Sequence, residues 1–174
     1  IKSDLKLLNN IQFNLMSVAF SRGTADYVAL FEPTASLIAR EKNFHILSAL
    51  GKECDEVAYT GYCCSKTYFA DNKKIISKFI KVLHKAQKWI KSHTAKETAK
   101  VISRYFVEAD EELLSECIKN YLECDVWCDS PTISKQSFDM MQNIMIQAGE
   151  LEHSVNFDDI VNVNLAEEII DKKE

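Results

Sequence analysis

Hydrophobic and polar positions follow two periods in the first part of the chain. Short apolar runs at residues 5–8, 27–31 and 44–50 alternate with segments at 11–20 and 33–40 whose apolar residues recur at helical spacing. Short apolar runs between polar turns are typical of buried strands, whereas a recurrence every three or four residues is typical of helices. Because the connections are short, the alternation predicts a parallel sheet with right-handed crossovers, and therefore an α/β fold.

The later part of the chain has a different pattern. Residues 57–64 form one more extended run, in which Gly61 predicts a bend or a close approach of the backbone. From there the apolar spacing is helical as far as Gly149, which is expected to end a helix. Residues 164–170 predict a short final helix. Four further helices are expected to begin at polar capping residues: Asp71, Thr94, Asp110 and Ser134.

Composition supports a folded protein and restricts its partners. The 174 residues are 47% hydrophobic and 27% charged, which is enough apolar content for a core. The net charge of −5 argues against nucleic acid or an anionic membrane as the main partner. Lysines gather between residues 73 and 100, but apolar residues at helical spacing interleave with them, so we interpret these lysines as a solvated helix face.

The beginning of the sequence shows no targeting segment. It opens at Ile1 without Met, and the apolar run at residues 5–8 is too short for a secretory signal. No run reaches the roughly 18 apolar residues of a membrane-spanning helix. We therefore expect a processed chain or a piece of a longer protein.

Neither the cysteines nor the histidines form a reactive motif. The spacing of the six cysteines matches no zinc pattern, and the adjacent Cys63 and Cys64 are poorly placed to bridge each other. The four histidines share no local motif, and the sequence has no nucleophile elbow, phosphate loop or HExxH. The sequence therefore favours free thiols in a reducing environment, and it predicts no metal site, no cofactor and no catalytic residue.

Two junctions between an expected strand and an expected helix favour ligand binding. The first offers the amides of Asn10 and Gln12, and the second offers the carboxylate of Glu32 and the hydroxyl of Thr34. Small ligands bind at such junctions in open α/β sheets, where backbone N–H groups of the helix start are free. Alternatively, Asn10 and Thr34 are only helix caps, and Glu32 is a first-turn carboxylate. We favour capping for Asn10 alone, and a ligand site for Glu32 with Thr34.

The second junction also carries a resemblance to a known family. Residues 21–35 contain Gly23, Asp26, an apolar run and Glu32-Pro33, and this segment resembles the G-x-x-D-(apolar)-E-P segment of ABC-transporter substrate-binding proteins. The specific group is the nitrate, sulfonate, taurine and thiamine-pyrimidine-precursor class. Further segments match the family in the same order, which makes the resemblance specific: residues 10–13, 57–62, 87–90, 125–127 and 144–151.

The resemblance implies a periplasmic-binding-protein-like (type II) fold, in which two α/β lobes close on a ligand. Residues 1–55 would belong to the second lobe, and residues 56–174 would contain the hinge crossing and a helical return to the first lobe. Half of each lobe would lie outside this chain, so apolar surface should stay uncovered. Eight residues would line the cleft or its hinge: Asn10, Gln12, Glu32, Thr34, Tyr59, Thr60, Gly61 and Tyr62. For the two tyrosines, ordinary strand packing is an equal alternative.

The resemblance also implies a role in transport. The protein would capture a small organic ligand outside the cytoplasm, as a periplasmic protein or a cell-surface lipoprotein whose anchor is absent from this chain. It would deliver the ligand to the permease and ATPase subunits of an ABC importer. The Glu32 carboxylate suits an aminopyrimidine with N–H donors better than nitrate or sulfonate. One alternative is a pyrimidine synthase of thiamine biosynthesis, which has a cysteine-rich run that only Cys63-Cys64 resembles here. The other alternative is the effector domain of a transcription regulator.

Overall fold

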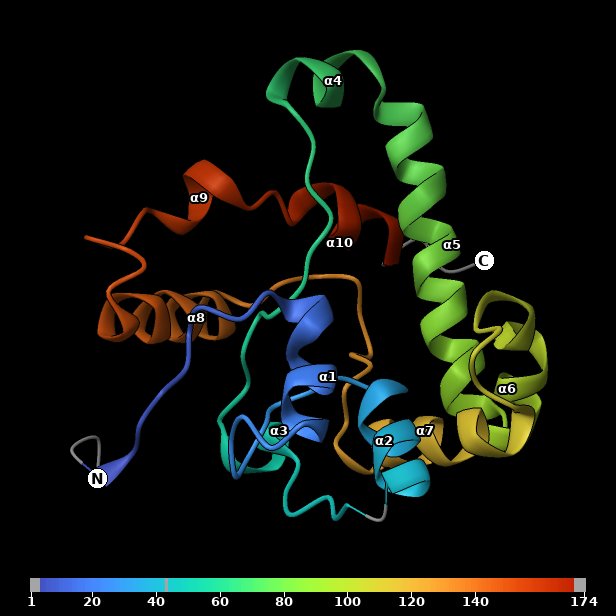
Figure 1. The fold of residues 1–174 in the computed structure, drawn as a ribbon. Coiled ribbons are helices and arrows are strands. Elements are labelled where there is room, and N and C mark those ends of the chain that lie inside the picture. Colours follow the sequence, from blue (N-terminus) through green and yellow to red (C-terminus); the bar gives the residue numbers. More distant parts are fainter. Residues whose placement is uncertain (1–3, 43, 171–174) are drawn as a thin grey trace. The chain divides into compact units, whose positions relative to one another are not determined.

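The computed structural model describes residues 4–42 and 44–170, and its regular structure is entirely helical there (Figure 1). Helix accounts for 59% of these described residues. One 3-10 helix precedes α1 and another follows α6: η2 (Phe13–Leu15) and η3 (Ser103–Tyr105). The α-helices are α1 (Met16–Ser21), α2 (Thr34–Lys42), α3 (Leu50–Glu53), α4 (Lys66–Asp71), α5 (Lys73–Ser92), α6 (Ala95–Ile102), α7 (Glu111–Glu123), α8 (Lys135–Ala148), α9 (Phe157–Ile160) and α10 (Asn164–Ile170).

The predicted α/β fold with a parallel-rich sheet is therefore wrong. No strand occurs among the described residues, and the apolar runs at 5–8, 27–31 and 44–49 are irregular segments. A run becomes a strand only when its backbone groups pair with a neighbouring strand. Here aromatic side chains from these runs pack onto helical segments instead. The Phe31 ring lies 5.3 Å from the Phe13 ring, and the Phe44 ring lies 4.7 Å from the Phe20 ring.

The helix starts were predicted more accurately than the strands. Ser134 Oγ accepts a hydrogen bond from Ser137 N at 3.0 Å, and Asp110 Oδ1 accepts one from Leu113 N at 2.7 Å, so both predicted caps are confirmed. Gly149 follows α8 with a left-handed φ of 80°, as a glycine after a helix end should. The final helix has the predicted bounds, whereas the short helices α3, α4 and α9 were not predicted.

The chain divides into two compact units, each built from two separate stretches. Unit 1 contains residues 1–48 and 95–120, and unit 2 contains residues 49–94 and 121–174. Each unit thus combines residues from both sides of position 55. The lobe boundary expected at that position was implied for a protein longer than this chain, and it stays a prediction.

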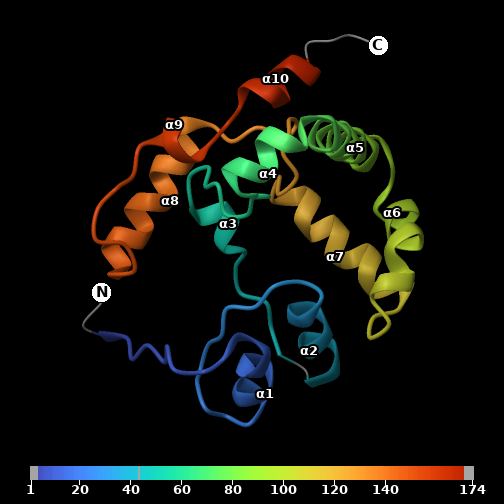
Figure 2. The same cartoon turned by 90° about the horizontal axis from the view of Figure 1, so that it is seen from above.

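In unit 1, α1 and α2 lie side by side (Figures 1 and 2), while the first part of α7 supplies most of the core. The apolar residues of α7 recur at helical spacing, which places them together on the inner face of the helix. Arg40 on α2 forms ion pairs with Asp110 and Glu112 at the α7 start. The buried residues of unit 1 are Ser36, Thr98, Ala99, Ala109, Leu113, Leu114, Cys117 and Ile118.

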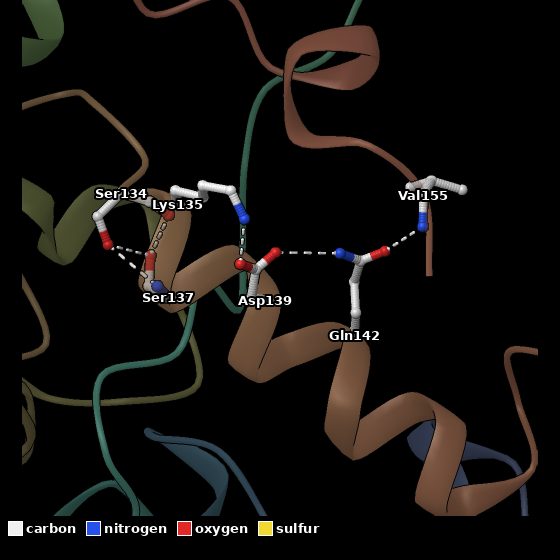
Figure 3. Close-up of polar contacts among 6 residues, drawn as sticks. All are labelled: Ser134, Lys135, Ser137, Asp139, Gln142 and Val155. Carbon is white, nitrogen blue, oxygen red and sulfur yellow. Dashed lines mark hydrogen bonds and ion pairs between the residues drawn. The ribbon is translucent and has the colours of Figure 1, made fainter. Parts of the chain in front are cut away.

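In unit 2, a polar network fastens α8 to the segment that leads into α9 (Figure 3). The buried Gln142 accepts a hydrogen bond from Val155 N at 2.6 Å through Oε1, and its amide nitrogen donates to Asp139 Oδ1 at 3.4 Å. Lys135 pairs with the other oxygen of Asp139. The Phe138 ring on α8 and the Phe157 ring on α9 meet edge to face, 5.5 Å apart, so they also join α8 to this region. Gln142 is therefore the polar centre of this contact.

Replacing Gln142 with leucine is expected to destabilise unit 2 by about 2 kcal/mol. The variant keeps the side-chain size but leaves Val155 N without its acceptor, and an unpaired backbone group costs about 1–3 kcal/mol. Chemical denaturation measures the loss. Gln136→Leu, at an exposed position of the same helix, serves as the control and should change stability by less than about 0.5 kcal/mol. Equal losses in the two variants would contradict this role for Gln142.

No helix within residues 4–42 and 44–170 combines the length and the apolar composition that crossing a bilayer requires.

Candidate functional site

The second predicted junction forms a turn that enters α2. Ala35 N donates to Phe31 O at 3.0 Å and Leu37 N donates to Pro33 O at 2.9 Å, so the helical hydrogen bonds begin at this turn. The helix itself begins at Thr34, one residue later than predicted. The sequence pattern of an apolar run, Pro and then small residues thus located the helix start correctly.

The Glu32 carboxylate closes this turn from within its own chain. Its Oε2 accepts hydrogen bonds from Ser36 N at 3.0 Å and from Cys117 Sγ at 3.5 Å. Its Oε1 accepts from Ser36 Oγ at 2.9 Å and from Asn120 Nδ2 at 2.9 Å. A carboxylate has about four acceptor positions, and these four bonds fill them. Glu32 therefore accepts from Ser36 N, a helix-start N–H group that was expected to be free for a ligand. Its bonds to Cys117 and Asn120 also connect the α2 start to α7.

The thiol of Cys117 takes part in this cluster as a proton donor. Burial raises its pKa from the ordinary 9.0 to about 12, and the negative charge of Glu32 acts in the same direction. A thiol with so high a pKa stays protonated at neutral pH and is a poor nucleophile. Cys117 is therefore a structural residue.

The raised pKa predicts that Cys117 destabilises the fold in alkaline solution. The unfolded thiol loses its proton near pH 9, whereas the folded thiol keeps it up to about pH 12, so the unfolded state binds fewer protons between these values. The Cys117 contribution to stability is thus constant below pH 9 and declines from pH 9 to 12. Denaturation midpoints at about pH 8 and pH 10.5 should fall further in the wild type than in Cys117→Ala. Parallel declines would contradict the prediction.

A small pocket lies beside the start of α2, within unit 1. Its volume is about 80 Å³, and it joins the η2–α1 segment to the α2 start. None of residues 9–12 of the first predicted junction lines this pocket. Thr34 is the predicted site residue that lines it. The full lining is Phe13, Asn14, Ser17, Leu30, Phe31 and Thr34.

On the η2–α1 side, the polar residues that line the pocket differ from those predicted. Asn10 and Gln12 are exposed and precede the pocket, and Gln12 stands before η2 without a side-chain capping bond. Asn14 and Ser17 line the pocket in their place. Sequence reasoning missed them because it assigned the polar groups to the loop before the helix. The helical spacing of three residues between them was the available signal.

A larger and more open hollow lies between α2 and α7. Its volume is about 370 Å³, and Arg40, Glu112 and Glu116 give it mixed charge. Arg40 already pairs with Asp110 and Glu112, so its positive charge is partly neutralised. Because these charges pair with one another, we place the candidate site at the smaller pocket.

The four predicted hinge residues belong to unit 2, where residues 57–64 form an irregular segment. Ala58 N donates to Ser137 O at 3.1 Å, which fastens this segment to the start of α8. Tyr59 and Thr60 are exposed, and the exposed Tyr62 ring packs edge-on against Phe79 at 4.8 Å. A Cβ at Gly61 would lie 3.4 Å from Ile133 Cδ1, an ordinary contact with a flexible side chain. Their ligand role stays a prediction.

All six cysteines are free thiols in the structure. Cys54, Cys63, Cys64 and Cys128 are exposed, while Cys117 is buried. No group of three or more potential ligand side chains that could hold a metal occurs within residues 4–42 and 44–170.

Comparison with known proteins relates the chain to one curated protein. It is 32% identical over 170 residues to a Bacillus subtilis (strain 168) protein named "Putative binding protein YtlA". The match covers 98% of this chain and 51% of the relative, so the chain spans about half the length of that protein. No protein-family profile matches the chain, and no solved structure does. The similarity supports a binding-protein family.

Proposed function

We propose that the protein is a solute-binding component of an ABC importer, and that the pocket around Thr34 forms one wall of its ligand site. The observation that carries the proposal is a pocket between the η2–α1 segment and the α2 start, which the predicted site residue Thr34 lines. The similarity to a protein named as a binding protein supports the same class.

The pocket's lining favours a flat, neutral heterocycle as the ligand. Asn14, Ser17 and Thr34 supply an amide and two hydroxyls, while Phe13 and Phe31 supply ring surface. None of the six lining residues is Lys or Arg, so a nitrate or sulfonate would find no opposite charge there. An aminopyrimidine such as the thiamine precursor can both stack on the rings and exchange hydrogen bonds with the polar groups.

The pocket is smaller than a complete ligand site. Small-molecule sites usually measure about 300–1,000 Å³, well above the 80 Å³ of this pocket. The proposed ligand would therefore occupy this wall with part of its surface and contact other residues elsewhere. A ligand-contacting role for Tyr59, Thr60, Gly61 and Tyr62, which belong to unit 2, is a separate proposal.

Glu32 has a positioning role in this proposal. The sequence suggested that its carboxylate accepts N–H groups of the ligand, but its acceptor positions are filled by Ser36, Cys117 and Asn120. Glu32 instead fixes the first turn of α2 and with it the position of Thr34. Asn10 and Gln12, exposed beside the pocket, are proposed to complete its rim.

The partners and location follow from the class. The protein is proposed to work outside the cytoplasm and to pass its ligand to permease and ATPase subunits.

Calorimetric titration of the chain with three probes tests the proposal. The aminopyrimidine precursor of thiamine should bind more tightly than taurine and nitrate. Thr34→Val removes one hydroxyl and keeps the shape, so it should weaken aminopyrimidine binding about tenfold. Thr67→Val, on an exposed face of α4, is the matched control and should bind like the wild type. Tighter binding of taurine or nitrate, or equal affinities of the two variants, would overturn the proposal.

A further inference from the structure

Helix α5 has an amphipathic sequence but no buried residue. It runs from Lys73 to Ser92, and none of its 20 residues is buried in the structure. Helices in proteins gain most of their stability by packing an apolar face, so an amphipathic helix of this length normally covers a core. The apolar residues of α5 are thus at most half-buried, and part of its apolar surface is exposed.

The uncovered part is a defined stripe. Ile75, Phe79 and Val82 follow one another at helical spacing on one side of α5, and they are 57%, 41% and 62% exposed. Tyr62 packs against Phe79 and is itself 80% exposed, so it extends the same surface. We call Ile75, Phe79, Val82 and Tyr62 the α5 stripe.

The rest of unit 2 covers α5 only in part. The seven-residue helix α10 packs against it, and α4 contacts its start (Figure 1). Lysines occupy the strip of α5 beside the stripe, and the helix contains no acidic residue. The lysine strip is Lys74, Lys78, Lys81, Lys85 and Lys88.

We propose that the α5 stripe is the docking surface for the polypeptide that corresponds to the unmatched half of the Bacillus subtilis relative. That relative is about twice as long as the aligned region, so a protein of this kind contains as much chain again. An apolar stripe beside a lysine strip would be covered by an apolar surface with acidic residues at its edge.

Two other occupants fit less well. In a symmetric dimer of this chain through α5, each stripe would face its own copy and the two lysine strips would be brought together, which like charges oppose. An anionic membrane would attract the lysines but repel a chain whose net charge is −5. A covering polypeptide with acidic residues at its edge would bring no lysine strips together and would not involve an anionic membrane.

Light scattering and hydrogen exchange on the 174-residue chain test the proposal. Mixed with the unmatched half of the relative, the chain should form a one-to-one complex, with amides of α5 exchanging more slowly. Val82→Gln and Ile75→Gln alter exposed positions, so the isolated chain should keep its helix content while the complex weakens about tenfold. Lys81→Gln, on the lysine strip, is the control and should weaken it much less.

Three outcomes would overturn the proposal. They are the absence of a complex, a homodimer that buries the α5 stripe, and binding of the chain to anionic vesicles through α5. The experiment contains no small ligand, so its result is independent of the function proposed for the Thr34 pocket.

Discussion

Replacing Glu32 with alanine is expected to lower the free energy of unfolding of unit 1 by about 3 kcal/mol. The substitution removes the acceptor of four hydrogen bonds at once, two from Ser36 and one each from Cys117 and Asn120. Ser36 and Cys117 are buried, so water cannot easily replace the lost oxygens. The α2 start should loosen, with faster hydrogen exchange at Ser36 N.

Two further variants make this prediction specific. Glu32→Gln keeps an oxygen acceptor but turns the other position into a donor that faces donors, so it should lose about half as much stability. Glu41→Ala removes an exposed carboxylate from the same helix and should change stability by less than about 0.5 kcal/mol. Denaturant unfolding measures all three. A loss for Glu32→Ala no larger than that for Glu41→Ala would show that the cluster does not hold α2.

Replacing Leu114 with alanine is expected to be the other large perturbation, again about 3 kcal/mol. Leu114 is 2% exposed on the inner face of α7, and truncating a buried leucine costs about 2–5 kcal/mol because a cavity replaces its methyl groups. Thermal and denaturant unfolding should both shift. The helix itself should persist, since alanine has a high helix propensity.

Val107→Ala is the matched control for this core prediction. Val107 belongs to the same unit but is 92% exposed, so its methyl groups are already in water. Its truncation should change stability by less than about 0.5 kcal/mol. Similar losses at Val107 and Leu114 would contradict the assignment of the unit 1 core to α7.

The contrast between helices and strands shows what the sequence could establish. The caps at Asp110, Ser134 and Gly149 were predictable because each acts within one turn of chain. The strands at 27–31 and 44–50 were not, because a strand depends on a distant neighbour and periodicity does not name that neighbour. Phe31 and Phe44 looked like strand residues but pack onto Phe13 and Phe20.

The candidate site was predicted in part for the same reason. Sequence order placed Thr34 at the start of a helix, and Thr34 lines the pocket, whereas none of residues 9–12 of the junction paired with it does. The α7 partners of Glu32 could not be predicted from the sequence, because Cys117 and Asn120 lie more than 80 positions further along the chain. A carboxylate at a helix start can face a ligand or its own protein, and only the contacts of α7 decide between them.

Amide NMR of the 174-residue chain would show whether the pocket around Thr34 is a ligand-binding wall. On titration with the aminopyrimidine precursor of thiamine, we predict shifts concentrated at residues 13–17 and 30–34, which contain the lining of the pocket. Little change is expected at the 370 Å³ hollow around Glu112. An absence of shifts, or shifts centred on that hollow, would contradict the claim.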